Sequence, residues 1–284
     1  MFNKIYNISA DLRSILSSRS NESVPRLILL TLYLKFRIKL LLRKIFLIKW
    51  KREFFFGLYI SFLDYKDFFA LWREIFVFGN YYFKTEKSSP LIIDCGSNIG
   101  MSVLFFKFIY PSSRIICFEP DPDAFSILKK NIDVNCFSGI ELHNAALGSK
   151  DGVAYLHRNS SNLASPGSTI MDNMYIGDKD ETIKVDLLKL SSFIKGPVDF
   201  LKMDIEGAEY DIFDDIKGRI HLVDAISMEI HSGYSMMEKR MSNILESLED
   251  SNFTYIITQT SVIHREFIDN PAINFSILLD AKRI

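Results

Sequence analysis

From Leu91 to the end of the chain, short apolar runs alternate with amphipathic segments of helix length, and this alternation restricts the fold more than any other feature. An apolar run too short for a helix is typical of a strand that is buried on both faces of a parallel sheet. The runs that we expect to be strands are 91–94, 114–118, 140–143, 198–203, 225–230, 253–258 and 273–279. The sequence therefore predicts an α/β fold with helices on both faces of a mainly parallel sheet.

The segments between these runs complete the predicted architecture. Those that we expect to be helices are 100–110, 123–134, 208–216 and 236–250. Parallel neighbours need a long crossover, but 259–270 shows no helical pattern, so we expect the last two strands to be antiparallel. In the aromatic-rich segment before Leu91 we predict a short strand, a helix at about 66–76 and a second strand that ends at Tyr82.

The charges divide the chain into a basic arm and an acidic body, although the 284 residues carry a formal net charge of only −1. Residues 1–52 have a balance of +10, which leaves −11 for the remainder. We expect three parts: a basic, apolar helical arm (1–52), an aromatic-rich lead-in that packs on the main domain (53–90), and the α/β domain (91–284). An acidic body argues against a nucleic-acid partner, because phosphate binding requires clustered cations.

The apolar stretch 27–50 is long enough for a membrane span, but six lysines and arginines interrupt it. Each costs roughly 2.5–3.5 kcal/mol at the centre of a bilayer, so we reject a transmembrane helix. Two interpretations of residues 26–52 remain: a basic interfacial helix on anionic lipid, or a helix packed on the main domain with its cations in water. The first is weakened because the cations are spread around the helix.

The start of the chain and its cysteines favour a cytoplasmic location. Residues 1–13 are polar and charged, so we expect no cleavable signal peptide. Cys95, Cys117 and Cys136 show no C-x-x-C spacing and cannot all pair, so we expect neither a disulfide framework nor a zinc site. If the arm binds lipid, the protein would be peripheral at the inner face of the membrane.

The first strand of the alternation runs into the turn D-C-G-S-N-I-G, where Asp94, Gly96, Asn98 and Gly100 occupy alternate positions. Glycines there permit a tight turn and let backbone amides approach a ligand at a helix N-terminus. The pattern is neither a phosphate-binding loop nor G-x-G-x-x-G. An acid at the strand end favours a cationic ligand such as an ammonium or a sulfonium. The glycines alone fit a turn without a ligand equally well.

A second acid follows at the end of the next strand, where Glu119 lies 25 residues after Asp94. Beside the first turn of a doubly wound sheet, such an acid can accept hydrogen bonds from both hydroxyls of a ribose. It could instead cap the helix that begins at Asp121 or Asp123. The two acids together favour a nucleoside ligand.

Four motifs in this order resemble the FkbM family of methyltransferases: D-C-G-S-N-I-G, F-E-P, H-N-A-A-L-G at 143–148 and D-F-L-K-M-D-I-E-G-A-E at 199–209. The likeness extends from about residue 71 to residue 279. It implies a Rossmann-like class I sheet with strand order 3-2-1-4-5-7-6 and an antiparallel strand 7. It also implies S-adenosylmethionine as the cofactor and O-methylation of sugars, polysaccharides, glycolipids or polyketides.

The resemblance also implies which residues bind the cofactor. They are Asp94, Gly96, Ser97, Asn98 and Gly100 for the methionine part, Glu119 for the ribose with Pro120 beside it, Asn144 and Ala145 near the adenine, and Tyr82 closing over the methionine end. Ser97 replaces the alanine that is usual in the family, a change that should not impair binding.

Methyl transfer to a hydroxyl needs a group that removes the hydroxyl proton, and candidates should lie where the next two strands end. Asp204 ends one strand, and Glu229 and His231 share a face at the end of the other. One hypothesis makes His231 or Asp204 the base, with Glu229 orienting His231. The alternative is that all three bind Mg²⁺ or another divalent cation, which lowers the pKa of an acceptor hydroxyl.

The long polar excursion 158–181 separates two strand-like segments at 153–157 and 182–186. Loops of this length inside a compact domain are uncommon unless they are functional. We therefore predict a lid on the acceptor side, in which Ser168 and Asn173 contact the acceptor. A surface loop without such a role is the alternative.

The sequence thus favours an S-adenosylmethionine-dependent O-methyltransferase that acts on a sugar, a polysaccharide or a lipid-linked glycan. A nicotinamide-dependent oxidoreductase on a similar sheet is disfavoured by the missing G-x-G-x-x-G pattern and by Asp94. A non-catalytic module docked on a membrane would explain the basic arm, but it would not explain the acids at the ends of four strands.

Overall fold

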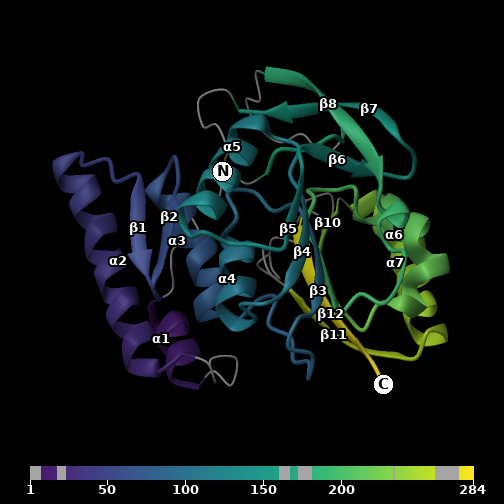
Figure 1. Ribbon diagram of the computed structural model, residues 1–284, viewed down its shortest axis with the longest axis horizontal. Helices are drawn as coiled ribbons and strands as arrows, with labels where there is room; N and C mark the ends of the chain where they lie inside the picture. The colour runs from purple at the N-terminus through teal and green to yellow at the C-terminus, as the bar shows by residue number, and fades with distance from the viewer. Residues whose placement is uncertain (1–7, 18–23, 160–166, 172–180, 233, 260–274) are drawn as a thin grey trace.

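A seven-stranded sheet organises the molecule, with its strands in the order β11-β12-β10-β9-β3-β4-β5. The computed structural model describes residues 8–17, 24–159, 167–171, 181–232, 234–259 and 275–284 (Figure 1). The strands are β3 (Leu91–Cys95), β4 (Arg114–Phe118), β5 (Ile140–His143), β9 (Phe200–Met203), β10 (Ala225–Ser232), β11 (Phe253–Gln259) and β12 (Phe275–Arg283). The run from β10 to β5 is parallel, and β12 is antiparallel to both of its neighbours. This is the strand order that the family resemblance implies.

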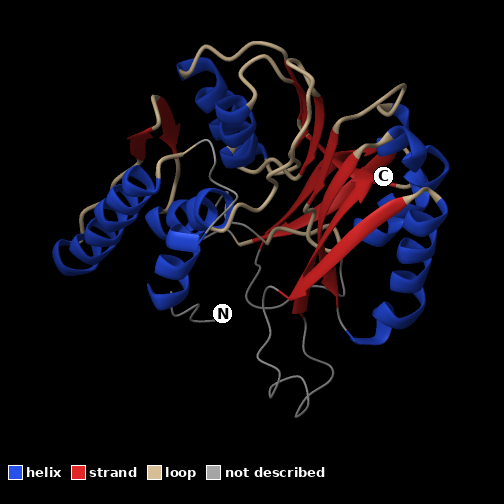
Figure 2. Ribbon diagram, turned by 90° about the horizontal axis from the view of Figure 1, so that it is seen from below, coloured by secondary structure: helices blue, strands red, loops and turns tan. Residues whose placement is uncertain are grey.

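Helices cover both faces of this sheet, as predicted (Figure 2). They are α4 (Met101–Ile109), α5 (Pro122–Val134), α6 (Glu209–Ile216) and α7 (Tyr234–Asp250), with short 3₁₀ turns at Leu190–Ser192 and Lys217–Leu222. Successive strand residues point to opposite faces, so Ile92 packs in one hydrophobic core with α4 and α5, and Ile93 packs in the other with α6. The apolar runs are therefore continuous because each strand lies between two cores.

A second, three-stranded sheet, in the order β6-β8-β7, lies beyond the end of β5. Its strands are β6 (Ala145–Gly148), β7 (Gly152–Arg158) and β8 (Glu181–Lys189). The two strand-like segments that flank the polar excursion are thus an antiparallel pair. Arg158, at the end of β7, pairs with Asp121 and Asp123 at the start of α5 and with Glu181 of β8, and so fixes the small sheet to the large one.

The N-terminal part of the chain contains the elements α1 (Ile8–Ser17), α2 (Arg26–Phe46), β1 (Arg52–Phe55), β2 (Leu58–Ser61) and α3 (Tyr65–Trp72). The predicted short strand is a hairpin, and the predicted helix is α3 continued by a π-helical turn at Arg73–Val77. The prediction of a strand that ends at Tyr82 was wrong. Gly79 and Tyr81 adopt positive φ angles of 75° and 69°, so the segment turns instead of extending.

One face of α2 packs into the molecule and shares the hydrophobic core of the sheet. Its buried residues are Leu29, Tyr33 and Phe36. The Phe36 ring meets that of Trp72 edge to face at 4.9 Å between centroids, a favourable geometry for aromatic pairs. As predicted, none of the helices that the structure describes is both long and apolar enough to cross a membrane.

A buried ion pair joins α1 to the π-helical turn. The Arg73 guanidinium donates to both carboxylate oxygens of Asp11, with 2.9 Å from Nε to Oδ2, and Tyr33 donates to the same Oδ2 at 2.8 Å. Asp11 is fully buried and Arg73 almost so. Burial, and next the bond to Asp11, raises the pKa of Tyr33 to about 12, which keeps the phenol a donor. The N-terminal helices are therefore held by polar bonds as well as by the aromatic core.

We predict that Asp11→Ala lowers the free energy of unfolding by about 3–5 kcal/mol, because it leaves the Arg73 charge buried without its partner. Urea denaturation measures the change. The matched control is Asp214→Ala, which removes an exposed pair with Lys217 and should cost under about 1 kcal/mol. Equal losses in the two variants would contradict the structural role of the buried pair.

Candidate functional site

A cavity opens at the carboxyl ends of β3, β4 and β9, the edge where the sequence places the site. Its walls come from six segments that are distant in sequence. Among the residues that line it are Leu71, Ile75 and Tyr81; Gly96, Ser97 and Asn98; Phe118, Glu119, Pro120 and Asp121; Ala145, Ala146, Leu147 and Leu156; Gly167, Ser168 and Ile170; and Lys202, Asp204, Ile205 and Glu206.

The turn after β3 approaches β9 so closely that its first glycine cannot be replaced without displacement. Gly96 has φ +83°, and a Cβ there would lie 1.9 Å from the backbone oxygen of Asp204. Gly100, at φ +88°, precedes α4, and its Cβ would meet the Leu128 side chain at 2.6 Å. The glycines that the sequence singles out are thus required by the packing of the turn itself.

Glu119 is buried at the end of β4, with both carboxylate oxygens held by backbone amides. The amide of Asn98 donates to Oε2 at 2.7 Å, and that of Asp121 donates to Oε1 at 2.9 Å. Burial raises the pKa of Glu119 to about 7, although these two amides favour the charged form and oppose the shift. Each oxygen keeps one lone pair, so the carboxylate can accept two further hydrogen bonds inside the cavity.

A buried lysine that sequence reasoning missed connects the two acids at the ends of β3 and β9. Lys202 Nζ lies 3.2 Å from Asp94 and 3.8 Å from Asp204, and it donates to the Gly96 carbonyl. Ser102 donates to Asp94 at 2.6 Å. The prediction that Asp94 attracts a cationic ligand needs correction, because the Lys202 ammonium already balances its charge.

Asp204 stands at the cavity wall, where Tyr81 donates to its Oδ2 at 3.0 Å. Burial, and next the charge of Asp204, raises the pKa of Tyr81 well above its usual value, so the phenol remains protonated. Tyr81 lines the cavity, whereas the predicted Tyr82 packs against the hydrophobic core instead. The lead-in therefore contributes Tyr81 to the cavity and not Tyr82, because the positive φ of Tyr81 turns its side chain toward β9.

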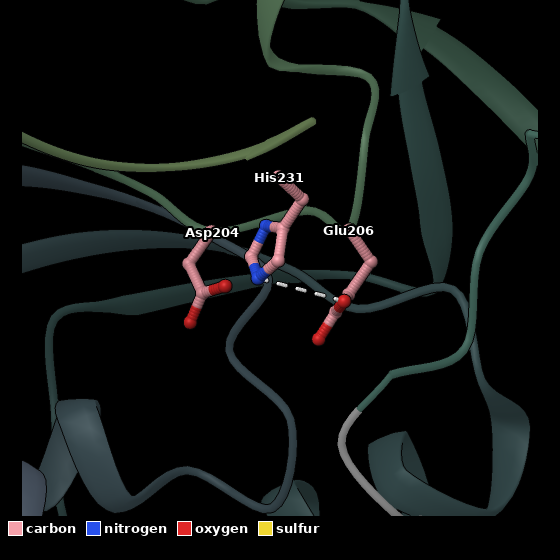
Figure 3. Close-up of side chains that lie close together, drawn as sticks. All are labelled: Asp204, Glu206 and His231. Carbon is pink, nitrogen blue, oxygen red and sulfur yellow. Dashed lines mark ion pairs between the residues drawn. The ribbon is translucent and has the colours of Figure 1, made fainter. Parts of the chain in front are cut away.

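His231 projects toward Asp204 and Glu206, and the three side chains converge in Figure 3. Its Nδ1 lies 3.0 Å from the buried Glu209, which also accepts from the amides of Ile205 and Gly207. The predicted partner, Glu229, is 3.8 Å from Nε2, so the expectation that Glu229 orients His231 needs correction. Glu209 takes that role because the turn after β9 brings the first residue of α6 under the ring.

The surrounding carboxylates determine the charge of His231. Burial disfavours the imidazolium, but Glu206, Glu209 and Asp204 together raise the pKa of His231 well above its usual value. These carboxylates thus favour the imidazolium form of His231, whose charge offsets part of the acidic cluster. Burial, and next the charge of Asp204, raises the pKa of Glu229 to about 7.

The residues that could surround a cation differ from the predicted set of Asp204, Glu229 and His231. Among the described residues, Asp204, Glu206 and His231 each offer a ligand atom, and these atoms lie within 4.8 Å of one another. Glu206 thus takes the place of Glu229. A metal ion and a protonated His231 exclude each other, because a histidine ligand must be neutral.

A family model named "Methyltransferase FkbM domain" matches residues 94–256, more than half of the chain.

The chain belongs to the FkbM methyltransferase family.

Three relatives of this FkbM-family chain are informative. "Methyltransferase 1" from Beauveria bassiana is 32% identical over 158 residues, which cover 49% of this chain and 64% of that protein. "2-O-methyltransferase NoeI" from Sinorhizobium fredii is 25% identical, with coverages of 45% and 57%. "Hexuronic acid methyltransferase AglP" from Haloferax volcanii is 27% identical, with coverages of 52% and 58%. The chain thus spans less than two thirds of the length of each of these relatives.

The remaining predicted site residues of this FkbM-family chain lie at or beside the cavity. Pro120 and Ala145 line it. Asn144 does not, because its side-chain amide donates to the Glu119 carbonyl at 2.8 Å and so holds the end of β4 in place. Ser168 also lines the cavity, where the polar excursion returns to the site, whereas Asn173 lies outside the described residues.

We predict that Gly96→Ala destabilises the protein by several kcal/mol, since it adds a backbone clash to the strain of a positive φ. Gly57 is the matched control, because it has φ +79° but no atom lies within 4 Å of the point that a Cβ would occupy. Gly57→Ala should cost only the strain, about 1–2 kcal/mol. Thermal and urea unfolding compare the two, and equal costs would show that the contact with Asp204 does not matter.

Proposed function

We propose that this methyltransferase uses S-adenosylmethionine to methylate a hydroxyl group of a glycan. The observation that carries the cofactor assignment is Glu119: a buried carboxylate with two remaining acceptor positions, at the strand end beside the glycine turn. Such a carboxylate fits the two hydroxyls of a ribose. Backbone amides hold this carboxylate, so a purely structural ion pair is a poor alternative.

The other walls of the cavity fit the remaining parts of the cofactor. The side chains of Phe118, Ala146, Leu147 and Leu156 make an apolar wall beside Glu119, which suits an adenine ring. The Gly96 turn and the start of α4 suit the methionine part, whose carboxylate is favoured at a helix N-terminus. When bound, S-adenosylmethionine supplies an electrophilic methyl group on a sulfonium centre.

The names of two relatives support a sugar hydroxyl as the acceptor. AglP is named a hexuronic acid methyltransferase, and NoeI is named a 2-O-methyltransferase. The side of the cavity formed by Asp204 and Glu206 offers carboxylate acceptors of the kind that bind hydroxyl groups. We therefore propose a glycan acceptor, either free or linked to a lipid.

Among the side chains at this side of the cavity, Asp204 is the best candidate to take the acceptor proton. It lines the cavity, and Tyr81 and Lys202 fix its position. The carboxylates around His231 favour its imidazolium form, so it suits a second role, in which its charge stabilises Asp204 and Glu206 beside the acceptor. A positioned base of this kind accelerates proton removal about 10²–10⁴-fold.

We predict that S-adenosylhomocysteine binds about tenfold more weakly at pH 6 than at pH 8, because Glu119 protonates near pH 7 and then offers fewer acceptor positions. Calorimetric titration at several pH values measures this dependence. In Glu119→Gln the affinity should be lower at every pH, and it should no longer change between pH 6 and pH 8.

The control for this titration is Glu141→Gln, a substitution of an exposed glutamate on the neighbouring strand β5. It should leave both the affinity and its pH dependence unchanged. If Glu119→Gln retained the affinity of the natural protein, the ribose assignment would fail. If neither protein bound the ligand, the proposed cofactor itself would be rejected.

We predict that Asp204→Asn lowers methyl transfer about 10²–10⁴-fold while the affinity for S-adenosylhomocysteine changes little. The assay follows labelled methyl groups from S-adenosylmethionine into a panel of oligosaccharides that contain hexuronic acids and neutral sugars. Mass spectrometry then locates the ether. Asp214→Asn, on the exposed face of α6, is the control. If Asp204→Asn kept full turnover and His231→Gln lost it, His231 and not Asp204 would be the base.

The same assay decides between the base and a metal ion. Because the neighbouring carboxylates favour the imidazolium form of His231, which cannot ligate a metal, we predict that turnover persists in EDTA. Loss of turnover in EDTA that Mg²⁺ or Mn²⁺ restores would instead assign Asp204, Glu206 and His231 to a divalent cation.

A further inference from the structure

An apolar stripe, interrupted by Thr31, follows the outward face of α2, the helix at the outer edge of the molecule in Figure 1. Its residues, each between 50% and 74% exposed, are Leu27, Leu34, Ile38, Leu41 and Ile45. Intervals of seven, four, three and four residues place them on one side of a helix. At 1.5 Å per residue the stripe is about 27 Å long. The opposite side of α2 holds the buried Leu29, Tyr33 and Phe36, so the stripe has no role in the core.

Cations border this stripe on both sides. The helical positions of Arg26, Arg37 and Lys44 place them along one border, and Lys35 lies at the other. Lys39 and Arg43 follow Lys35 at four-residue intervals, but they turn progressively away from the stripe toward the inner side of α2. The cations of α2 therefore leave the side that bears the stripe free of charge, and they are not spread evenly around the helix. This arrangement removes the objection to a membrane contact that rested on their distribution.

Acids of the neighbouring elements hold three of these cations in place. Lys35 and Lys39 both pair with Glu53 of β1, and Arg43 pairs with Asp64, the residue that caps α3. These pairs fix the helix against the hairpin, so the stripe faces away from the body. The segment 26–52 itself contains no acid, so its net charge stays strongly positive even after the charges of Glu53 and Asp64 are subtracted.

We propose that α2 lies in the surface of an anionic membrane, with the stripe among the acyl chains and the cations at the headgroups. Exposed apolar area supplies one part of the affinity, and each lysine or arginine near an anionic surface adds about 1 kcal/mol. A second copy of the chain fits this face poorly, because pairing two stripes would bring rows of like charge together. The net positive charge thus selects anionic lipid over another α2.

This contact would hold the proposed active site close to the lipid surface. The Phe36 ring on the inner side of α2 packs against Trp72, and the adjacent Leu71 lines the cavity, as does Ile75. Only the layer formed by α3 and the π-helical turn therefore separates α2 from the cavity. The membrane proposal does not depend on the reaction, but it would suit an acceptor that is anchored in lipid.

The test measures co-sedimentation of the full chain with vesicles of phosphatidylcholine, alone and mixed with phosphatidylserine. Deletion of the arm would also remove Phe36 and Tyr33 from the core, so substitutions on the exposed face are sharper. Leu34→Glu/Leu41→Glu should lower binding to the anionic vesicles at least about tenfold. Tyr155→Glu/Ile256→Glu is the matched control, since it changes two apolar residues that are 61% and 68% exposed on other elements. Thermal melting checks that both variants fold.

A site-specific probe gives an independent readout. Cys136 is the one exposed cysteine of the three, so a Cys136→Ser background allows an environment-sensitive dye to be attached at Ile38→Cys. Its emission should shift to the blue with anionic vesicles, and the same dye at Tyr155→Cys should not shift.

Three results would overturn the proposal. The natural chain could fail to bind anionic vesicles, or the stripe variant could bind them as well as the natural chain does. Light scattering could also show a dimer that Leu34→Glu/Leu41→Glu dissociates, which would assign the stripe to a second copy. Binding that rises with phosphatidylserine, falls with salt and is lost in the stripe variant supports it.

Discussion

The site depends on the ion pairs that the Lys202 ammonium makes with Asp94 and Asp204. This ammonium lies between the acids that end β3 and β9, and it reaches the carbonyl of the turn that follows β3. A buried cation is tolerable only when such partners surround it, so the three groups fix one another's positions. The close approach of Gly96 to Asp204 belongs to the same arrangement, since a wider gap would pull Lys202 away from one of its acids.

Around this point both faces of the large sheet serve as support, and the candidate chemistry lies at one edge. One face and the N-terminal helices share an aromatic core, in which Phe83 stacks on Phe200 at 4.4 Å between centroids. The other face packs against α6 and α7. The acids and His231 gather only at the carboxyl edge, where the strands end and backbone groups need partners. Rigid strands thereby hold the side chains that a substrate would meet.

Much of the fold and part of the candidate site could be predicted from the sequence, because buried parallel strands and glycine turns have recognisable local sequence patterns. Glu119 could be placed because it ends an apolar run. Lys202 could not, because a single lysine within such a run only weakens the strand pattern, although its spacing from Asp204 puts both on one face. The contact of Glu209 with His231 could not be predicted, because a glutamate in the first turn of a helix is already explained by its favourable interaction with the helix dipole. The sequence points to Tyr82 where the structure has Tyr81, because a run of aromatic residues does not show which side chain faces the cavity.

The shared aromatic core also affects how the chain is made. The residues of α2 and α3 leave the ribosome well before β9 supplies Phe200, so their apolar sides must wait for most of the sheet to be synthesised. During that interval the nascent chain presents a large hydrophobic surface, and aggregation or chaperone binding competes with folding. A helix with cations along both borders stays soluble in this period better than a purely apolar one would. The N-terminal position of the aromatic segment thus makes the order of synthesis part of the folding problem.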